Sequence, residues 1–511
     1  MLAKLNHQLI NYLKNHYKNI LIFMIIFFIV TPIFLEKNIS DLDELWNYNF
    51  AKNIADGLVP YRDFNMLQTP LLPFIAGFIL KIFGNELIVM RIFGIFLISF
   101  IFYMIYKIFK LIKINSAFIF LSLLFIFILL KNYLCIDYNF SVLALTLLII
   151  YLEIKYYQKK ESILSFYFFD DLLIGLLAGC CILLKQSTGF LISAMAIGFK
   201  LLMVKNKNDF QLFLKIAFTR ILGIFIPVLL LIIYLIFNHA FHDFINYTIL
   251  GIKTFTNKIP YTSLVHSNYM IIKILSIFIP IFLLISTICV IKKKNVITRI
   301  LFFYSIGSLI VIYPISDNIH FLIGITPSIL LFLYFIFNLL NSKIKKYNKN
   351  NLIIFMREFL KATMILLCIF FTLTEFIKLI HYISSNKDNF NFSHFNYIPM
   401  SEEQYNRIHL VDSYILSQNN PVYILDADAA LYMIPIDRYY KDFNLFLKGN
   451  LGEKDEDGQI EKINHLASGS QILIKNNNYK RNWQTPEKVI SYIQNNFHKI
   501  GEISLFNIYE K

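Results

Sequence analysis

The sequence predicts a polytopic α-helical membrane protein, with about 11 transmembrane helices followed by a small α/β domain. Hydrophobic residues make up 57% of the 511 residues, and the mean hydropathy is +0.58, well above the balance of a soluble domain. Apolar segments recur between residues 19 and 380, whereas the composition from residue 381 onward is polar and has no long apolar run. We therefore expect a membrane domain at residues 1–380 and an extracytoplasmic α/β domain at residues 381–511.

Charge and cysteine content exclude other classes of protein. Lys and Arg number 48 against 33 Asp and Glu, a net charge of +15 that would indicate nucleic-acid binding in a soluble protein. Here the basic residues lie between apolar segments, so membrane topology explains them and no nucleic-acid partner is expected. The five cysteines lie in or beside apolar segments without metal-ligand spacing, which indicates small core residues rather than disulfides. No small-residue cleavage site follows the first apolar run, which predicts an uncleaved first helix.

The apolar segments define the predicted spans and their orientation. A span needs about 20 largely apolar residues, and we assign spans to residues 19–35, 88–108, 114–134, 140–154, 166–184, 189–204, 221–237, 269–291, 300–313, 320–340 and 352–380. Lys and Arg concentrate at residues 1–18, 107–113, 155–160, 200–220, 292–299 and 343–361. By the positive-inside rule these segments face the cytoplasm. The N-terminus is then cytoplasmic in a multi-pass protein of the cell membrane, and the loop at residues 36–87 and the tail lie outside.

This first outer loop, residues 36–87, predicts two helices at the membrane surface. Apolar and aromatic side chains alternate with polar ones between residues 41 and 55, which favours a short interfacial helix with Trp46 at head-group depth. Gly57 and Pro60 end this helix, and Pro70 begins a second apolar helix that reaches about Phe83. The second helix is too short to span the bilayer.

The tail predicts a small α/β arrangement. Strands are expected at residues 421–425, 470–475 and 502–509, and helices at residues 402–417 and 486–497. The polar run from Lys448 to Gly458 predicts a surface loop. The tail is long enough for one small domain.

The first outer loop also carries a motif that resembles a known family. Asp43-Glu44 and Trp46 are followed by Gly57-Leu-Val-Pro-Tyr-Arg-Asp-Phe64, by Gln68-Thr-Pro-Leu-Leu72 and by Phe83-Gly84. This pattern, which extends over roughly residues 19–200, resembles the GT-C superfamily of membrane glycosyltransferases, and within it the protein O-mannosyltransferase and lipid A aminoarabinose transferase branch. The resemblance implies an inverting enzyme that transfers a sugar from a polyprenyl-phosphate carrier, such as undecaprenyl phosphate. The acceptor is expected to be a cell-envelope glycan, glycolipid or protein on the outer face of the membrane.

Three acidic residues are the catalytic candidates. Sugar transfer needs a base that takes the proton of the acceptor hydroxyl, and a carboxylate at the mouth of a membrane cavity can supply it. The resemblance places Asp43 in this position, with Glu44 as its partner and Asp137 as a second acid between the third and fourth spans. Two simpler interpretations stay open. Acids in the first turn of a helix favour its dipole, and a lone acid in a loop is usually solvated.

Cations and amides are the candidates for binding the donor phosphate, namely Arg62, Gln68, Arg91, Lys185 and Gln186. A charge in the hydrocarbon costs roughly 2.5 to 3.5 kcal/mol, so Arg91 and Lys185 are expected to have partners or to line a cavity. For Arg91, snorkelling to the interface is an alternative. Many members of the family have Lys-Pro-Pro-Leu where this chain has Gln68-Thr-Pro-Leu71. Gln68 can donate a hydrogen bond but brings no charge.

Other polar groups are weaker candidates. Asp317 and His320 lie in a short outer loop that could contact the acceptor. The sequence predicts no metal site and leaves open a divalent cation as cofactor. The remaining polar groups have ordinary structural explanations. Those in one outer loop are explained as surface residues: His239, His242, Asp243 and His266. Those in the tail are explained as turn and core residues that could also face carbohydrate: Asp426–Asp428, Arg438–Tyr440 and Tyr479–Trp483.

A lipid-linked glycan transporter, or a non-catalytic assembly subunit, is the alternative from another functional class. Eleven spans would serve either protein. The acid-bearing interfacial helix favours the enzyme, because a carrier does not need it. Charged residues within the spans are expected to be sparse, whereas a transporter would need them on several spans.

Overall fold

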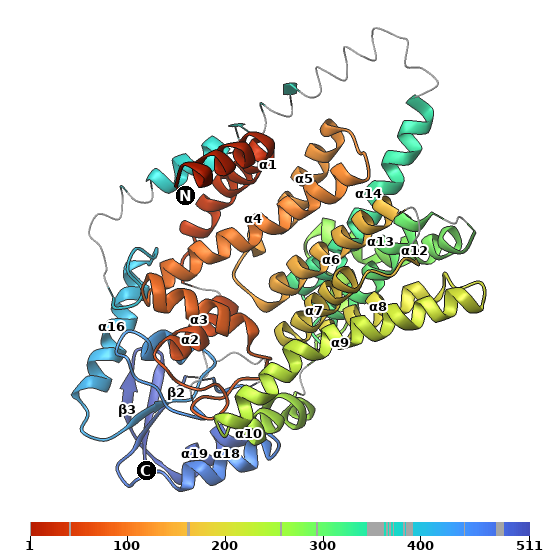
Figure 1. Ribbon diagram of the computed structural model, residues 1–511. Coiled ribbons are helices and arrows are strands. Elements are labelled where there is room, and N and C mark those ends of the chain that lie inside the picture. The colour runs from red at the N-terminus through yellow and green to blue at the C-terminus, as the bar shows by residue number, and fades with distance from the viewer. Residues whose placement is uncertain are drawn as a thin grey trace.

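The computed structural model describes most of the chain, and Figure 1 shows how its helices are arranged. The described residues are 2–39, 42–160, 164–255, 258–292, 295–344, 362–363, 366, 369–370, 372–381, 384, 392–443, 445–476 and 485–511. Side chains are described from Tyr17 onward. Long helices form one side of the molecule, and the tail lies against one end of them.

Seven helices in the described part of the chain are long and apolar enough to cross a membrane. They are α1 (Leu2–Leu35, apolar from Tyr17), α4 (Leu87–Leu111), α5 (Ser116–Leu130), α6 (Tyr138–Lys160), α9 (Lys207–Phe237), α12 (Met270–Lys292) and α14 (Asn318–Ile344). The chain is therefore a polytopic helical membrane protein.

Three further segments predicted as spans form shorter helices. Residues 166–184 and 189–204 become α7 (Phe168–Leu184) and α8 (Gln186–Leu201), and residues 300–313 lie in α13 (Val296–Ser308) and the 3-10 turn η4 (Leu309–Ile312). At 17, 16 and 13 residues, α7, α8 and α13 fall short of the about 20 residues of a straight span. The predicted span at residues 352–380 lies largely outside the described residues.

Glycine allows the short helix α7 to pack closely against α9. A Cβ atom at Gly175 would lie 2.3 Å from the carbonyl oxygen of Arg220, and one at Gly223 would lie 2.5 Å from the carbonyl oxygen of Leu172. Backbones that approach this closely are typical of helix contacts in membranes, where small residues replace the hydrophobic driving force. The contact fixes α7, which ends just before Lys185, against α9.

The first outer loop contains both predicted helices, α2 (Leu42–Ala55) and α3 (Leu71–Phe83). The positive φ of Gly57, 94°, ends α2 as expected. The indole nitrogen of Trp46, the side chain expected at head-group depth, donates to the carbonyl oxygen of Ala427 in the tail over 2.8 Å. Most of α2 is buried, since α3 covers one side of it and the tail covers another.

A four-stranded sheet organises the tail. The chain runs through α16 (Glu402–Ser417), β1 (Val422–Ile424), α17 (Ala430–Met433), α18 (Asp455–Asn464), β2 (Gln471–Lys475), α19 (Glu487–Asn496), β3 (His498–Ile503) and β4 (Phe506–Glu510). The strand order is β1-β2-β4-β3; β1 and β2 are parallel, and the other pairs are antiparallel. Apolar residues of β2, β4, α18 and α19 form the core beside the sheet.

Two predictions for the tail were wrong. The single strand expected at residues 502–509 is the hairpin of β3 and β4, which turns at Ser504 with a positive φ of 51°. The surface loop expected from Lys448 to Gly458 ends early, because α18 begins at Asp455. Three acidic residues in the first turn of α18 favour a helix there, since they complement its dipole.

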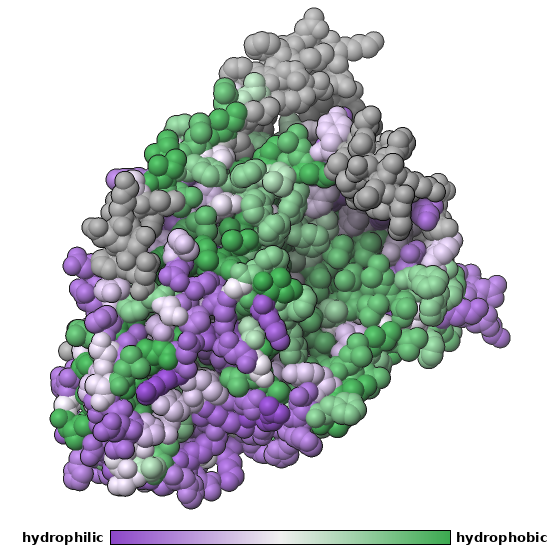
Figure 2. Space-filling model, turned by 60° about the vertical axis from the view of Figure 1, so that its left-hand side comes forward, coloured by the Kyte–Doolittle hydropathy of each residue, from purple (hydrophilic) through white to green (hydrophobic). Residues whose placement is uncertain are grey.

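Polar and apolar surfaces separate along the molecule (Figure 2). Hydrophilic residues gather over the tail and hydrophobic residues over the long helices.

Short elements connect the long helices, namely η1 (Lys131–Tyr133), α10 (Phe241–Ile245), η2 (Asn246–Leu250), η3 (Gly251–Thr254) and α11 (Thr262–Val265).

Candidate functional site

Polar residues from three distant parts of the chain meet at what we call the Asn139 cluster: Asp137, Asn139, Lys185, Asp317 and His320. Lys185 Nζ donates to Asn139 Oδ1 over 2.7 Å, and Asn139 Nδ2 donates to Asp137 Oδ2 over 2.8 Å. Asn139 Nδ2 also lies 3.4 Å from His320 Nε2, and His320 Nδ1 lies 2.8 Å from Asp317 Oδ1. The amide of Asn139 therefore links the start of α6 to both Lys185 and the start of α14.

The hydrogen bonds of this cluster orient the ring of His320. Because Asn139 Nδ2 can only donate, His320 Nε2 faces it as an acceptor, and His320 Nδ1 is placed to donate to Asp317 Oδ1. From the sequence, His320 and Asp317 were candidates only for contact with the acceptor substrate. The structure places them beside Asp137.

Local backbone structure directs Lys185 into the bundle. Lys185 has extended dihedral angles, φ −151° and ψ 109°, between the last residue of α7 and the first of α8. A Cβ atom at Gly189 would lie 2.1 Å from the backbone nitrogen of Ile182, so α8 can fold back against α7 only with glycine there. The break in the helix thus becomes a fixed position for one partly buried cation.

Opposing effects act on the charge of Lys185. Burial lowers its pKa to about 8, while the carboxylates of Asp137, Asp43 and Asp317 oppose this shift. Its ammonium group also lies 5.4 Å from the centre of the Tyr138 ring. Three carboxylates thus act on one lysine, and Asp43 of the first outer loop belongs to the same electrostatic environment as Asp137.

Helix α2 begins at the acidic pair singled out in the sequence, and the two acids have different surroundings. Asp43 is partly exposed, and its carbonyl oxygen accepts from Asn47 Nδ2 over 2.7 Å. Glu44 is buried and forms a bidentate ion pair with Arg91. Arg91 Nε lies 3.0 Å from Glu44 Oε1, and Arg91 Nη2 lies 2.8 Å from Glu44 Oε2. Arg91 is fully buried and also donates to the carbonyl oxygen of Lys37. Glu44 and Arg91 thus hold the start of α2 in place, with Asp43 next to them.

The three other candidates for phosphate binding contact parts of the chain outside the cluster. Arg62 is half-exposed and pairs with its neighbour Asp63 over 2.8 Å. Gln68 is held against the end of α7, because Thr69 Oγ1 donates to the carbonyl oxygen of Ile182 over 3.0 Å. Gln68 Nε2 is buried and has no hydrogen-bond partner among the described residues. Gln186 faces η2, with its Nε2 atom 3.5 Å from the carbonyl oxygen of Thr248.

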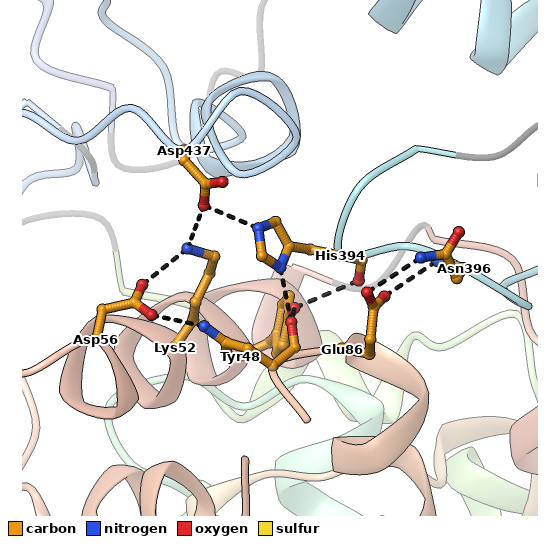
Figure 3. A network of polar contacts seen from close by, with 8 residues as sticks. Tyr48, Lys52, Asp56, Glu86, His394, Asn396 and Asp437 are labelled. Carbon is orange, nitrogen blue, oxygen red and sulfur yellow. Dashed lines mark hydrogen bonds and ion pairs between the residues drawn. The ribbon is translucent and has the colours of Figure 1, made fainter. Parts of the chain in front are cut away.

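A second polar network, shown in Figure 3, fixes the tail on α2. Lys52 Nζ lies 2.8 Å from Asp56 Oδ2 and 2.7 Å from Asp437 Oδ1. His394 bridges the same carboxylate of Asp437, at 2.8 Å, and the carbonyl oxygen of Asn85, at 2.7 Å. Burial alone would raise the pKa of Asp437, but hydrogen bonding and charge from Lys52 hold it below its usual value. The tail is therefore anchored to the helix that carries Asp43.

A polar cavity of about 330 Å³ lies between the start of α2 and the tail. Its lining combines Asn38 and Leu42 from the first outer loop with Glu403, Arg407 and Asp428 from the tail. Charges of both signs line it. A polar acceptor group has room to enter here, beside the turn that carries Asp43.

The expectation that charges are sparse in the membrane part is wrong. Arg220 of α9 pairs with Glu153 of α6 and with Asp171 of α7, the latter over 2.8 Å, and Lys200 of α8 lies 3.5 Å from Glu153. All four side chains are buried, and the space beside them, about 10 Å³, is too small for a sugar. Two acids offset two bases, so this cluster can join four helices without an unpaired charge.

Among the described residues, no group of three His, Cys, Asp or Glu side chains is arranged to hold a metal ion. The sequence analysis missed Asn139, which carries no charge and has no motif around it. It also missed the Lys52, His394 and Asp437 contacts, which join residues more than 300 positions apart.

Comparison with known proteins finds a similarity at the level of structure. No family model matches the chain, and no curated protein matches it. Among solved structures, the chain is similar to the Archaeoglobus fulgidus oligosaccharyltransferase, determined in complex with Zn and sulfate. The sequence identity is 10% and the TM-score is 0.47 over 82% of this chain. The chain spans 61% of the length of that relative.

Proposed function

We propose that the protein is a GT-C-type membrane glycosyltransferase that transfers a sugar from a polyprenyl phosphate to a cell-envelope acceptor. The observation that supports this most directly is the grouping of Asp43, Asp137 and Asp317 around the partly buried Lys185. Such a group supplies both a base and a cation at one place, the two roles that the reaction needs. The motif around Asp43 in the sequence supports the same reaction.

In the proposed mechanism Asp43 is the base. It accepts the proton of the acceptor hydroxyl as the oxygen attacks the anomeric carbon from the face opposite the phosphate. The bond between the anomeric carbon and the phosphate oxygen breaks, and polyprenyl phosphate leaves, so the configuration inverts. The cluster has more carboxylates than cations. Its net negative charge stabilises the positive charge that develops on the sugar ring in an oxocarbenium-like transition state.

The other candidates take supporting roles in this proposal. Lys185 donates to the leaving phosphate, and the buried Nε2 atom of Gln68 supplies a further hydrogen-bond donor. Asp137 and Asn139 bind sugar hydroxyls. Arg91 and Glu44 act as positioning residues, because each is buried against the other. Arg62 and Gln186 lie at the edge of the site, where they contact the entering substrates.

Topology follows from the same proposal. The basic segments place the N-terminus in the cytoplasm and the tail outside. Because Lys52 of α2 is bonded to Asp437 of the tail, Asp43 lies on the side of the membrane that the tail occupies. The sugar would then be transferred on the outer face.

The test is an Asp43→Asn variant in membranes supplied with labelled polyprenyl-phosphate sugars. Loss of the base should reduce transfer by about 100-fold or more. The control is Asp457→Asn, since Asp457 is exposed and pairs with Lys488 at the surface, where a salt bridge contributes little. Full transfer by Asp43→Asn would contradict the mechanism.

One observation favours the transporter as a second candidate. The buried charges of Glu153, Asp171, Lys200 and Arg220 lie on four helices, as expected for a carrier. In sealed vesicles, a transporter would move a labelled lipid-linked sugar across the bilayer without transferring it. Translocation that persists in Asp43→Asn, together with no transfer by the wild type, would support the transporter over the enzyme.

A further inference from the structure

Two cavities follow one another along the same three segments of the chain, one of which is α1. The first, here called the apolar groove, has a volume of about 690 Å³. It is lined by residues between 22 and 30 of α1, by residues between 116 and 127 of α5, by two residues of α4, and by Ile369, Thr372 and Leu373. The second, here called the head-group pocket, has a volume of about 300 Å³ and is lined by residues 33–37, 131–134 and 375–378. In each segment, the residues that line the pocket follow those that line the groove within about two helical turns.

The order of these cavities matches the shape of a lipid. The groove lies at the depth of the apolar helices, and its lining is almost wholly hydrophobic. The pocket lies where α1 and α5 end and the polar loops begin. A basic pocket at the membrane-facing end of helices is the kind of site that binds lipid phosphate, and a groove beside it buries the chain.

The charge of the head-group pocket favours an anion. Lys37, Lys131 and Lys378 line it together with Glu36 and Glu375, so cations exceed carboxylates by one. Glu375 already pairs with Lys378 over 3.1 Å. Burial raises the pKa of Glu36, and the charge of Glu375 raises it further, which reduces the negative charge of the pocket. A phosphodiester, with one negative charge, matches this balance.

The pocket is separate from the Asn139 cluster, although one loop contributes to both. Lys131 and Leu134 line the head-group pocket, whereas Asp137 and Asn139, a few residues later, belong to the cluster around Lys185. Lys37 connects to the first part of this loop, with its Nζ atom 3.4 Å from the carbonyl oxygen of Leu134. A phosphate bound by Lys185 is therefore not the phosphate that the pocket would bind.

We propose that the apolar groove and the head-group pocket together bind an anionic glycerophospholipid, with its phosphodiester in the pocket and its acyl chains in the groove. The lipid belongs to the leaflet on the side of the tail. It is a second lipid site of the protein, and it does not depend on the assignment of the enzyme activity. By occupying the space between α1, α5 and residues 369–378, the lipid completes the packing of α1 on the bundle.

Lipid retention by the purified full-length protein tests the proposal. The protein is exchanged from phosphatidylglycerol-containing vesicles into detergent, and bound lipid is measured by native mass spectrometry. The double variant Lys131→Ala/Lys378→Ala should retain about tenfold less phosphatidylglycerol, because it loses two charge-assisted contacts. Its control is Lys159→Ala, at the exposed opposite end of α6, which should retain the lipid.

A second pair of variants tests the groove without removing a charge or a core side chain. Ile25 and Leu21 are exposed by 50% and 55% on the same helix, but only Ile25 lines the groove. Ile25→Trp should fill the groove and reduce retention, whereas Leu21→Trp should not. Equal retention by Ile25→Trp and the wild type would overturn the proposal, even if the lysine variant failed to fold.

Competing ligands distinguish the sources of phosphate. Inorganic phosphate lacks a chain and should not displace phosphatidylglycerol, and polyprenyl phosphate should not displace it at equal concentration. Displacement by inorganic phosphate would show that the groove contributes nothing. Preferential binding of polyprenyl phosphate would assign the groove to the isoprenoid carrier and overturn the proposed phospholipid.

Discussion

Lys185 shows how one partly buried residue can link stability and activity. Its charged form is opposed by burial and supported by three carboxylates, and its pKa is lowered to about 8. An ordinary lysine has a pKa near 10.5. At neutral pH the side chain is therefore mostly protonated, but it loses its proton within the range of pH in which the protein can be assayed.

We expect transfer and stability to respond to pH in opposite directions. If protonated Lys185 binds the leaving phosphate, transfer should fall as the pH rises through about 8. Between this pKa and that of the unfolded chain, the unfolded state binds more protons than the native state, so the free energy of unfolding should rise with pH. Activity profiles and thermal melts from pH 7 to pH 10 would check both.

Lys185→Arg provides the control for this prediction. Arginine keeps its charge throughout the range, so a variant that folds should lose the decline in transfer near pH 8. Lys185→Met should transfer poorly at every pH. A decline near pH 8 that persists in Lys185→Arg would assign the titration to another group.

At the level of elements, the sequence predicted the positions of α2 and α3 but not their surroundings. Gly57 and Pro70 mark the ends of these helices by local rules, which do not depend on the rest of the fold. Burial of α2 depends on the tail, and nothing local to Trp46 indicates that its partner is Ala427. The β3–β4 hairpin was missed for a similar reason, because Ser504 turns the chain without a glycine or proline signal.

The ion pair of Glu44 and Arg91 should stabilise the attachment of α2 to α4. Glu44→Gln leaves a fully buried guanidinium without its counter-charge, which should reduce the free energy of unfolding by about 3 to 5 kcal/mol. The double variant Glu44→Leu/Arg91→Met should recover most of this loss, because it removes both charges together. Denaturant unfolding of the three proteins would measure the difference.

The same variants separate positioning from stability. If the pair positions Asp43, the double variant should remain stable but transfer with a reduced kcat, since its α2 lacks the fixed start. A double variant that is both stable and fully active would show that the pair serves the fold alone. The recovery of stability distinguishes these outcomes from simple misfolding.

On the scale of the molecule, the two ends of the bundle differ in their polar chemistry. The cluster of Glu153, Asp171, Lys200 and Arg220 is balanced in charge and has little free space, whereas the Asn139 cluster has surplus carboxylates. The hydropathy of the sequence revealed the membrane fold, because apolar runs are a local property. Which charges pair across helices depends on packing, and this is why the first cluster was not expected.

The network that holds the tail over α2 supports a final prediction. Lys52 is buried between Asp56 and Asp437, so Lys52→Met removes the cation that joins α2 to the tail and leaves two carboxylates facing each other. Hydrogen exchange should become faster in α2 and in the segment around Asp437, by about tenfold if the contact contributes near 1.4 kcal/mol. The exposed Lys81, in the last turn of α3, gives the control Lys81→Met.

The pattern of exchange tells a loosened contact from general destabilisation. Strand β3 lies at the edge of the tail sheet opposite β1, so its protection should stay unchanged in Lys52→Met. Because the tail covers the helix that carries Asp43, transfer should fall in the same variant even though every residue of the Asn139 cluster is intact. Unchanged exchange in α2 together with reduced transfer would show that Lys52 acts on the substrate itself rather than through the position of the tail.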